Sequence, residues 1–119
     1  MEKDRRREEE RYEAVHLLHY ICLDSGGRQV GQGMARTLNI SEAGVKVETH
    51  EPIETRYILF LAIGIKEDIF DIKGKVIYCN RGENSRFESG IEFYEVDFDL
   101  YAKLRRFINE FKKNEGKDQ

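Results

Sequence analysis

Short strand-forming segments separated by turn signals occupy the chain from Ala14 to Phe93, and no helical period appears before Asp97. Six segments are expected, over residues 14–24, 30–40, 45–50, 57–65, 69–79 and 87–93. Glycine, serine and proline mark the breaks between them, as in Ser25-Gly26-Gly27 and at Pro52. This order predicts a mainly β domain in which six antiparallel strands form a barrel.

The first, second and fourth segments predict how the strands face the core. Apolar or strand-forming residues share one face in the first segment (Val15, Leu17, His19, Ile21 and Leu23) and one in the second (Val30, Met34, Leu38 and Ile40). With Leu38 and Ile40 inward, Asn39 and Ser41 point outward together. The continuous apolar run from Tyr57 to Ile65 predicts a strand that is covered on both sides.

A single amphipathic helix is expected after the strands. Asp97 is a plausible N-cap, and apolar residues then recur at helical spacing: Leu100, Leu104, Phe107, Ile108 and Phe111. This apolar stripe either covers the open end of the barrel, which we favour, or docks a partner helix. The expected organisation is a flexible charged arm (1–13), a barrel with its C-terminal helix (14–113) and a disordered tail (114–119).

Composition excludes several classes of protein. The 119 residues suit one domain, and a net charge of −3 argues against broad DNA or RNA binding, which needs a basic face. The N-terminus has no apolar signal sequence, and the longest apolar run is far shorter than the ~20 residues of a membrane helix. A cytoplasmic protein without membrane insertion is expected. Cys22 and Cys79 are interpreted as small buried side chains rather than a disulfide or a metal pair.

Catalytic machinery is not evident in the sequence. It contains no Ser-His-Asp set, no phosphate-binding Walker loop and no pair of acids at catalytic spacing. We therefore predict that the chain is not an enzyme and carries neither a catalytic residue, a metal site nor a cofactor.

The charged arm holds the first candidate binding element. Arg7 and Arg11 are four residues apart, and Arg6 precedes them. A guanidinium is planar and permanently charged, so it can bind phosphate oxygens or the O6/N7 edge of guanine with two hydrogen bonds. The alternative is that such a run is simply a solvated tail.

The second candidate element is Asn39-Ile40-Ser41-Glu42-Ala43-Gly44. Asn39 offers a donor and an acceptor and Ser41 a rotatable hydroxyl, so together they can read the edge of a purine. Gly44 stands where a side chain would obstruct close approach or where φ is positive. The alternative is an ordinary hairpin turn, which favours the same residue types.

Together, in this order, the RxxxR and [D/N]xSxxG elements resemble the PilZ family, as do Ser89-Gly90-Ile91-Glu92-Phe93 and the closing helix. The resemblance covers nearly the whole chain and implies a PilZ-type barrel that binds cyclic di-GMP. By this resemblance Arg7 and Arg11 contact guanine and phosphate, Asn39 and Ser41 read the guanine edge, and Gly44 completes the motif. Arg6 would favour two stacked ligand molecules.

Other positions modify this picture. Tyr78 either stacks on a base or is an ordinary strand tyrosine, which we favour. Glu8, Glu9 and Glu10 fill the variable positions of the arm motif and would weaken binding modestly, because exposed charges interact weakly.

The expected function is that of a receptor, a monomer or weak dimer, whose arm closes on cyclic di-GMP and signals to an unidentified effector protein. Motility, pili and exopolysaccharide are all possible outputs. The alternatives are a PilZ-like interaction module in pilus or motility assemblies that no longer binds the nucleotide, and a small barrel that binds single-stranded nucleic acid.

Overall fold

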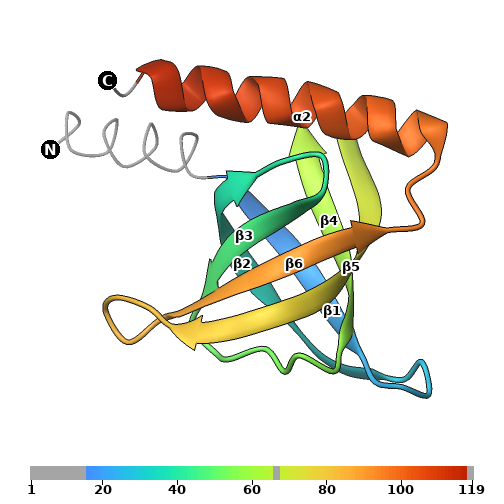
Figure 1. The fold of residues 1–119 in the computed structure, drawn as a ribbon, viewed down its shortest axis with the longest axis vertical. Coiled ribbons are helices and arrows are strands. Elements are labelled where there is room, and N and C mark those ends of the chain that lie inside the picture. Colours follow the sequence, from blue (N-terminus) through green and yellow to red (C-terminus); the bar gives the residue numbers. More distant parts are fainter. Residues whose placement is uncertain (1–15, 66–67, 118–119) are drawn as a thin grey trace, which may run out of the picture.

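The computed structural model describes residues 16–65 and 68–117. These residues form six strands and one helix: β1 (Leu17–Leu23), β2 (Gln29–Ile40), β3 (Gly44–Thr49), β4 (Ile58–Ile65), β5 (Asp68–Arg81), β6 (Phe87–Tyr94) and α2 (Phe98–Lys117). All neighbouring strands are antiparallel, and they close into a barrel in the order β1-β2-β3-β6-β5-β4. The predicted fold, a closed six-stranded antiparallel barrel with a C-terminal helix, is confirmed (Figure 1).

The barrel interior is filled by alternate residues of each strand. β4 contributes Leu59, Leu61 and Ile63, which are completely buried. Its other face is not covered as predicted: Phe60 is partly exposed and Lys73 lies over its ring at 5.8 Å. In an antiparallel barrel one face of every strand meets solvent, and here outward apolar residues made the run look continuous.

The facing of the first two strands differs from the sequence analysis. In β1 the core side chains are Leu18, Tyr20 and Cys22, on the face opposite Leu17 and His19. Both faces carry apolar residues, so alternation did not identify the inner one.

In β2, Val30 and Met34 are exposed whereas Ile40 is buried. The register shifts between Thr37 and Asn39, so a bulge moves the end of the strand to the other parity. The four residues that were expected on one face therefore do not share it. The consequence that matters for the site holds, because Ile40 points inward and Asn39 outward.

Helix α2 lies across one end of the barrel and packs against β4 and β5 (Figure 1). Asp97 caps it as predicted: its Oδ1 accepts a hydrogen bond from the Leu100 amide at 2.8 Å. The four buried side chains of the apolar stripe are Leu104, Phe107, Ile108 and Phe111. The predicted cover of the open barrel end is therefore confirmed.

The helix also continues to Lys117, beyond the expected start of a disordered tail at Asn114. The residues after Lys113 include no proline, and extending an existing helix adds one hydrogen bond per residue without a new nucleation cost. Polarity alone was therefore a poor indicator of the helix end.

Both cysteines are free thiols. Burial in the barrel raises the pKa of the Cys22 thiol above its usual value, which keeps it neutral in the core. Cys79 is half-buried, and its Sγ accepts a hydrogen bond from the Ile53 amide at 3.5 Å. Of the helical residues that the structure describes, none belongs to a segment long and apolar enough to cross a membrane.

Candidate functional site

The turn between β2 and β3 holds three of the predicted site residues. The Ser41 amide donates to the Gly44 carbonyl at 2.9 Å, and the Ala43 amide donates to Ser41 Oγ at 3.2 Å. Asn39 Oδ1 accepts a hydrogen bond from the Ile40 amide at 2.9 Å. The polar side chains thus fix the backbone of the turn, as the alternative of an ordinary hairpin turn required.

These contacts do not use the full hydrogen-bonding capacity of the turn. Asn39 and Ser41 are both exposed, and the Asn39 amide group has two donors besides its oxygen. The hydrogen bond of the Asn39 side chain to the described part of the chain is made by its oxygen. The turn therefore has a fixed shape and still presents a donor to the outside.

Gly44 allows the turn to lie close to β6. A Cβ atom at this position would stand 2.2 Å from the carbonyl oxygen of Ile91, which is backbone and cannot move aside. Only Gly27, among the described glycines, has a positive φ. Of the two explanations that the sequence analysis gave for Gly44, the close approach is the correct one.

An open hollow of about 360 Å³ lies on the outside of the barrel beside this turn. Its lining includes Asn39, Ser41 and Gly44 together with Lys46, Tyr78, Gly90 and Glu92. Lys46 pairs with Gly90 and Gly44 with Glu92 in the β3–β6 ladder, and Tyr78 pairs with Gly90 in the β5–β6 ladder. Three adjacent strands thus bring a cation, a carboxylate and an aromatic ring to the predicted motif.

Tyr78 shapes the floor of the hollow. A Cβ atom on Gly90 would lie 2.1 Å from the Tyr78 ring, so the ring rests directly on this glycine. Tyr78 keeps 38% of its surface exposed. An aromatic face in this position can stack on a planar base, although the ring also has a packing role over Gly90.

The turn also contacts the helix on its other side. Glu42 hydrogen-bonds to Tyr101, and its Oε1 lies 3.5 Å from Nε of Arg105. The hydrogen bond and the negative charge of Glu42, with partial burial, raise the pKa of the Tyr101 phenol. Glu42 therefore connects the motif turn to α2.

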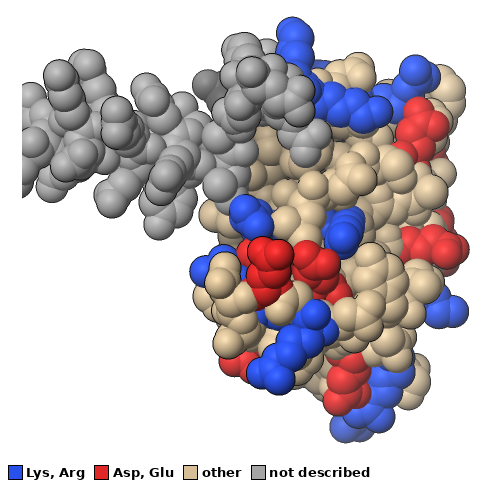
Figure 2. Space-filling view, turned by 60° about the vertical axis from the view of Figure 1, so that its left-hand side comes forward, with Lys and Arg blue, Asp and Glu red and all other residues tan. Residues whose placement is uncertain are grey.

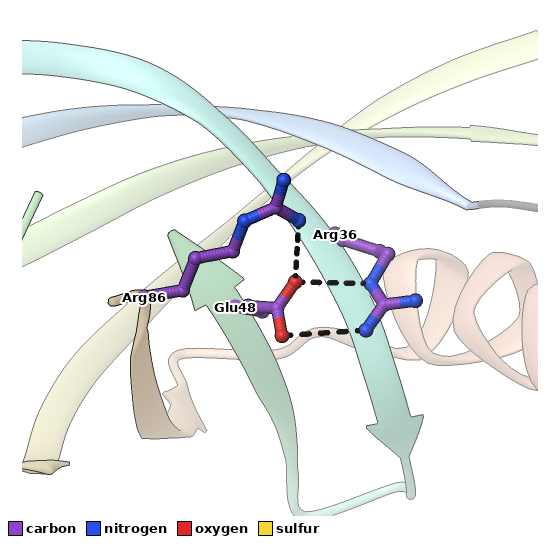
Figure 3. A network of polar contacts seen from close by, with 3 residues as sticks. All are labelled: Arg36, Glu48 and Arg86. Carbon is purple, nitrogen blue, oxygen red and sulfur yellow. Dashed lines mark hydrogen bonds and ion pairs between the residues drawn. The ribbon is translucent and has the colours of Figure 1, made fainter. Parts of the chain in front are cut away.

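Charged side chains lock the barrel surface at the far end of the same strands. Figure 3 shows Glu48 between Arg36 and Arg86, and the Glu48 side chain is only 10% exposed. Arg36 binds its carboxylate through Nε and Nη2, each at 3.3 Å, and Arg86 Nη1 lies 3.1 Å from Oε1. Because two arginines share this carboxylate, β2 and β3 are joined to the loop before β6.

Basic and acidic side chains are interleaved over the lower part of one face of the molecule, whereas Lys and Arg gather along the top, where α2 lies (Figure 2). This mixed distribution fits the net charge of −3. On this face, the described residues therefore show an excess of basic over acidic side chains only along the top, where α2 lies.

The structure brings together Asn39, Ser41 and Gly44, and the predicted arginines Arg6, Arg7 and Arg11 lie outside the described residues. Lys46, Gly90 and Glu92 line the hollow but were not identified as site residues from the sequence. Only the register between β3 and β6 places them there, and because these strands are not consecutive in the sequence, no local hairpin signal indicated their pairing.

The sequence model of the PilZ domain family matches residues 5–110 of the chain. The chain belongs to the PilZ family. Among solved structures, the chain is similar to the PilZ domain with c-di-GMP of YcgR from Escherichia coli, at 9% sequence identity and a TM-score of 0.62. The likeness covers 85% of this chain and 86% of that one, and it shows a shared fold. Comparison with curated proteins gives no match.

Proposed function

We propose that this PilZ protein is a receptor for cyclic di-GMP that binds it at the hollow beside the β2–β3 turn. The observation that carries the proposal is the arrangement of Asn39, Ser41 and Gly44 at the edge of a hollow open to solvent. Family membership supports it, as does the solved PilZ domain with c-di-GMP, which shares the fold.

Each side chain at the hollow has a chemical role to offer. The Asn39 amide and the Ser41 hydroxyl suit the polar edge of guanine. The ammonium group of Lys46 lies next to the site, with its Nζ 3.4 Å from Oε2 of Glu88. An anionic ligand in the hollow can attract this ammonium group. The Tyr78 ring provides an aromatic face for the base. The hollow thus offers a partner for the edge of the purine, for its flat face and for the phosphate of the ligand.

Arg7 and Arg11 complete the proposed site from the N-terminal arm. Their guanidinium groups bind guanine and phosphate, and the arm closes over the open side of the hollow. The ordering of the arm changes the surface offered to an effector protein, which is the proposed signal. The protein acts in the cytoplasm and has no catalytic activity of its own.

Calorimetric titration with cyclic di-GMP, with GMP as the control ligand, tests the proposal. We expect saturable binding by the parent protein that is reduced at least tenfold in Arg7→Ala and Arg11→Ala, since each removes a charge-assisted hydrogen-bond pair. Arg28→Ala is the matched control, because Arg28 is an exposed arginine in the β1–β2 turn. A ratio near two ligands per chain would support the role of Arg6.

Absence of heat from a folded protein at high concentration would overturn the receptor function and leave the interaction module. Equal binding by Arg7→Ala, Arg11→Ala and the parent would contradict the proposed role of the arm. Strong binding to oligonucleotides that falls steeply with salt would instead indicate a single-stranded nucleic-acid site.

A further inference from the structure

A second hollow, of about 450 Å³, lies between the motif turn and helix α2. The turn contributes Ser41, Glu42 and Ala43, and the helix contributes Arg105, Ile108, Asn109 and Lys112. Ser41 and Ala43 line both this helix-side hollow and the barrel-side hollow described above. The turn is therefore a thin wall between two open spaces, and a ligand larger than either can extend across it.

The helix side of this hollow is basic. Arg105, Asn109 and Lys112 are spaced by four and three residues, which places them on one face of the helix above the turn. They offer two cations and an amide. The other charge among the described residues that line the hollow is the carboxylate of Glu42, so these residues carry a net charge of +1.

Glu42 occupies Arg105 only weakly. The pair is separated by 3.5 Å, and both side chains are more than half exposed, at 64% and 52%. Such solvent-exposed pairs contribute little to stability. A phosphate that accepts two hydrogen bonds from Arg105 competes well with the single contact that the Glu42 carboxylate makes. Arg105 is thus held ready for an anion by a partner that is easily displaced.

We propose that the helix-side hollow is a phosphate-binding subsite, in which Arg105 and Lys112 hold a phosphodiester of the cyclic dinucleotide whose base lies in the barrel-side hollow. The inference rests on the proposed function. Binding replaces Glu42 at Arg105, so one contact between the motif turn and α2 is broken when the ligand arrives. The subsite thereby couples ligand binding to the helix.

Two double variants with the same charge change test the subsite. Arg105→Ala/Lys112→Ala removes the proposed phosphate ligands, and Lys103→Ala/Arg106→Ala removes two exposed cations of the same helix that do not line the hollow. In calorimetry at low salt, we expect the first to weaken cyclic di-GMP binding about three- to tenfold and the second less than twofold. Thermal unfolding verifies that both are folded.

Glu42→Gln provides a test with the opposite sign. The amide keeps the shape of the side chain but no longer competes for Arg105, so we expect binding to become about two- to threefold tighter. Glu83→Gln, an exposed glutamate in the β5–β6 loop, is its control and should leave affinity unchanged.

The possible failures are distinguishable. If the parent binds cyclic di-GMP and the two double variants bind equally well, the subsite is overturned and the receptor function stands. Unchanged or weaker binding by Glu42→Gln would overturn the competition between Glu42 and phosphate. If the parent itself does not bind, the receptor function fails and the subsite with it.

Discussion

The two ends of the β3–β6 ladder are built from the same pair of strands but differ in what they present outward. At one end Glu48 stands opposite Glu88, and cations neutralise both carboxylates: Arg36 and Arg86 bind Glu48, and Lys46 lies 3.4 Å from Glu88. At the other end the ladder carries Gly44 and Gly90, and the surface is hollowed.

The difference shows how one sheet supplies both rigidity and space. Like charges placed opposite each other repel, so the locked end depends on its arginines and lysine. The open end depends on the lack of side chains at Gly44 and Gly90, which lets β6 and Tyr78 come close. The space available to a ligand therefore exists because two positions lack a side chain. It lies next to a part of the sheet that ion pairs hold in place.

Filling the open end should have the largest effect. In Gly44→Ala the new Cβ would meet the Ile91 carbonyl oxygen at 2.2 Å, and separating two hydrogen-bonded strands should lower the free energy of unfolding by about 3 kcal/mol. Urea denaturation measures it. Gly31→Ala is the control, since its Cβ would meet only Cys22 atoms at 3.9 Å. Equal stability of the two variants would remove the close-approach explanation.

Unlocking the charged end should cost less. Glu48→Gln keeps the shape but loses the charge that binds Arg36 and Arg86, and we expect the free energy of unfolding to fall by about 1–2 kcal/mol. Glu54→Gln disrupts an exposed pair with Arg56 and should change it by less than about 0.5 kcal/mol. If Glu48→Gln is as stable as Glu54→Gln, the ion pairs of Glu48 do not stabilise this end of the sheet.

Removing the ring on the floor of the hollow should have a moderate effect that falls on the ligand. Tyr78→Ala uncovers Gly90 and removes the proposed stacking face, so we expect cyclic di-GMP affinity to fall about fivefold. Tyr78→Phe keeps the ring and should bind like the parent. If Tyr78→Ala also binds like the parent, Tyr78 is an ordinary strand tyrosine.

The smallest effect concerns the contact of the turn with α2. The Glu42 carboxylate favours the protonated Tyr101 phenol, so its pKa is raised, and any stability from this contact is present below about pH 10 and lost above it. Glu42→Ala should lower the pKa of Tyr101 towards its usual value. An NMR titration of ring-labelled tyrosine, assigned with Tyr101→Phe, measures this. An unchanged titration would mean that the turn and helix do not touch in solution.

Much of the architecture was predictable because local signals agree with it. Turn residues separated six strand segments, and Asp97 with the apolar stripe after it marked the helix. Gly44 was also recognised as a position where a side chain would obstruct. These features depend on short-range chemistry that a few neighbouring residues determine.

The remaining features depend on pairing between distant residues. The bulge before Asn39 changes which residues at the end of β2 point into the barrel, and no local pattern in the sequence indicated it. Lys46, Gly90 and Glu92 belong to the hollow only because β3 and β6 pair in one particular register, across more than forty residues of sequence. Neither the bulge in β2 nor the register between β3 and β6 can be read from composition or from the alternation of apolar and polar residues.

Closure of the barrel has a consequence for association. Each of the six strands is paired with two neighbours, so no strand forms a free edge along its whole length, although residues 29–35 of β2 pair with β1 alone. This protects a domain rich in strand-forming residues from edge-to-edge aggregation. It also favours partners that recognise side chains, on the outer wall, on the motif turn or along α2, over partners that add a strand to the sheet.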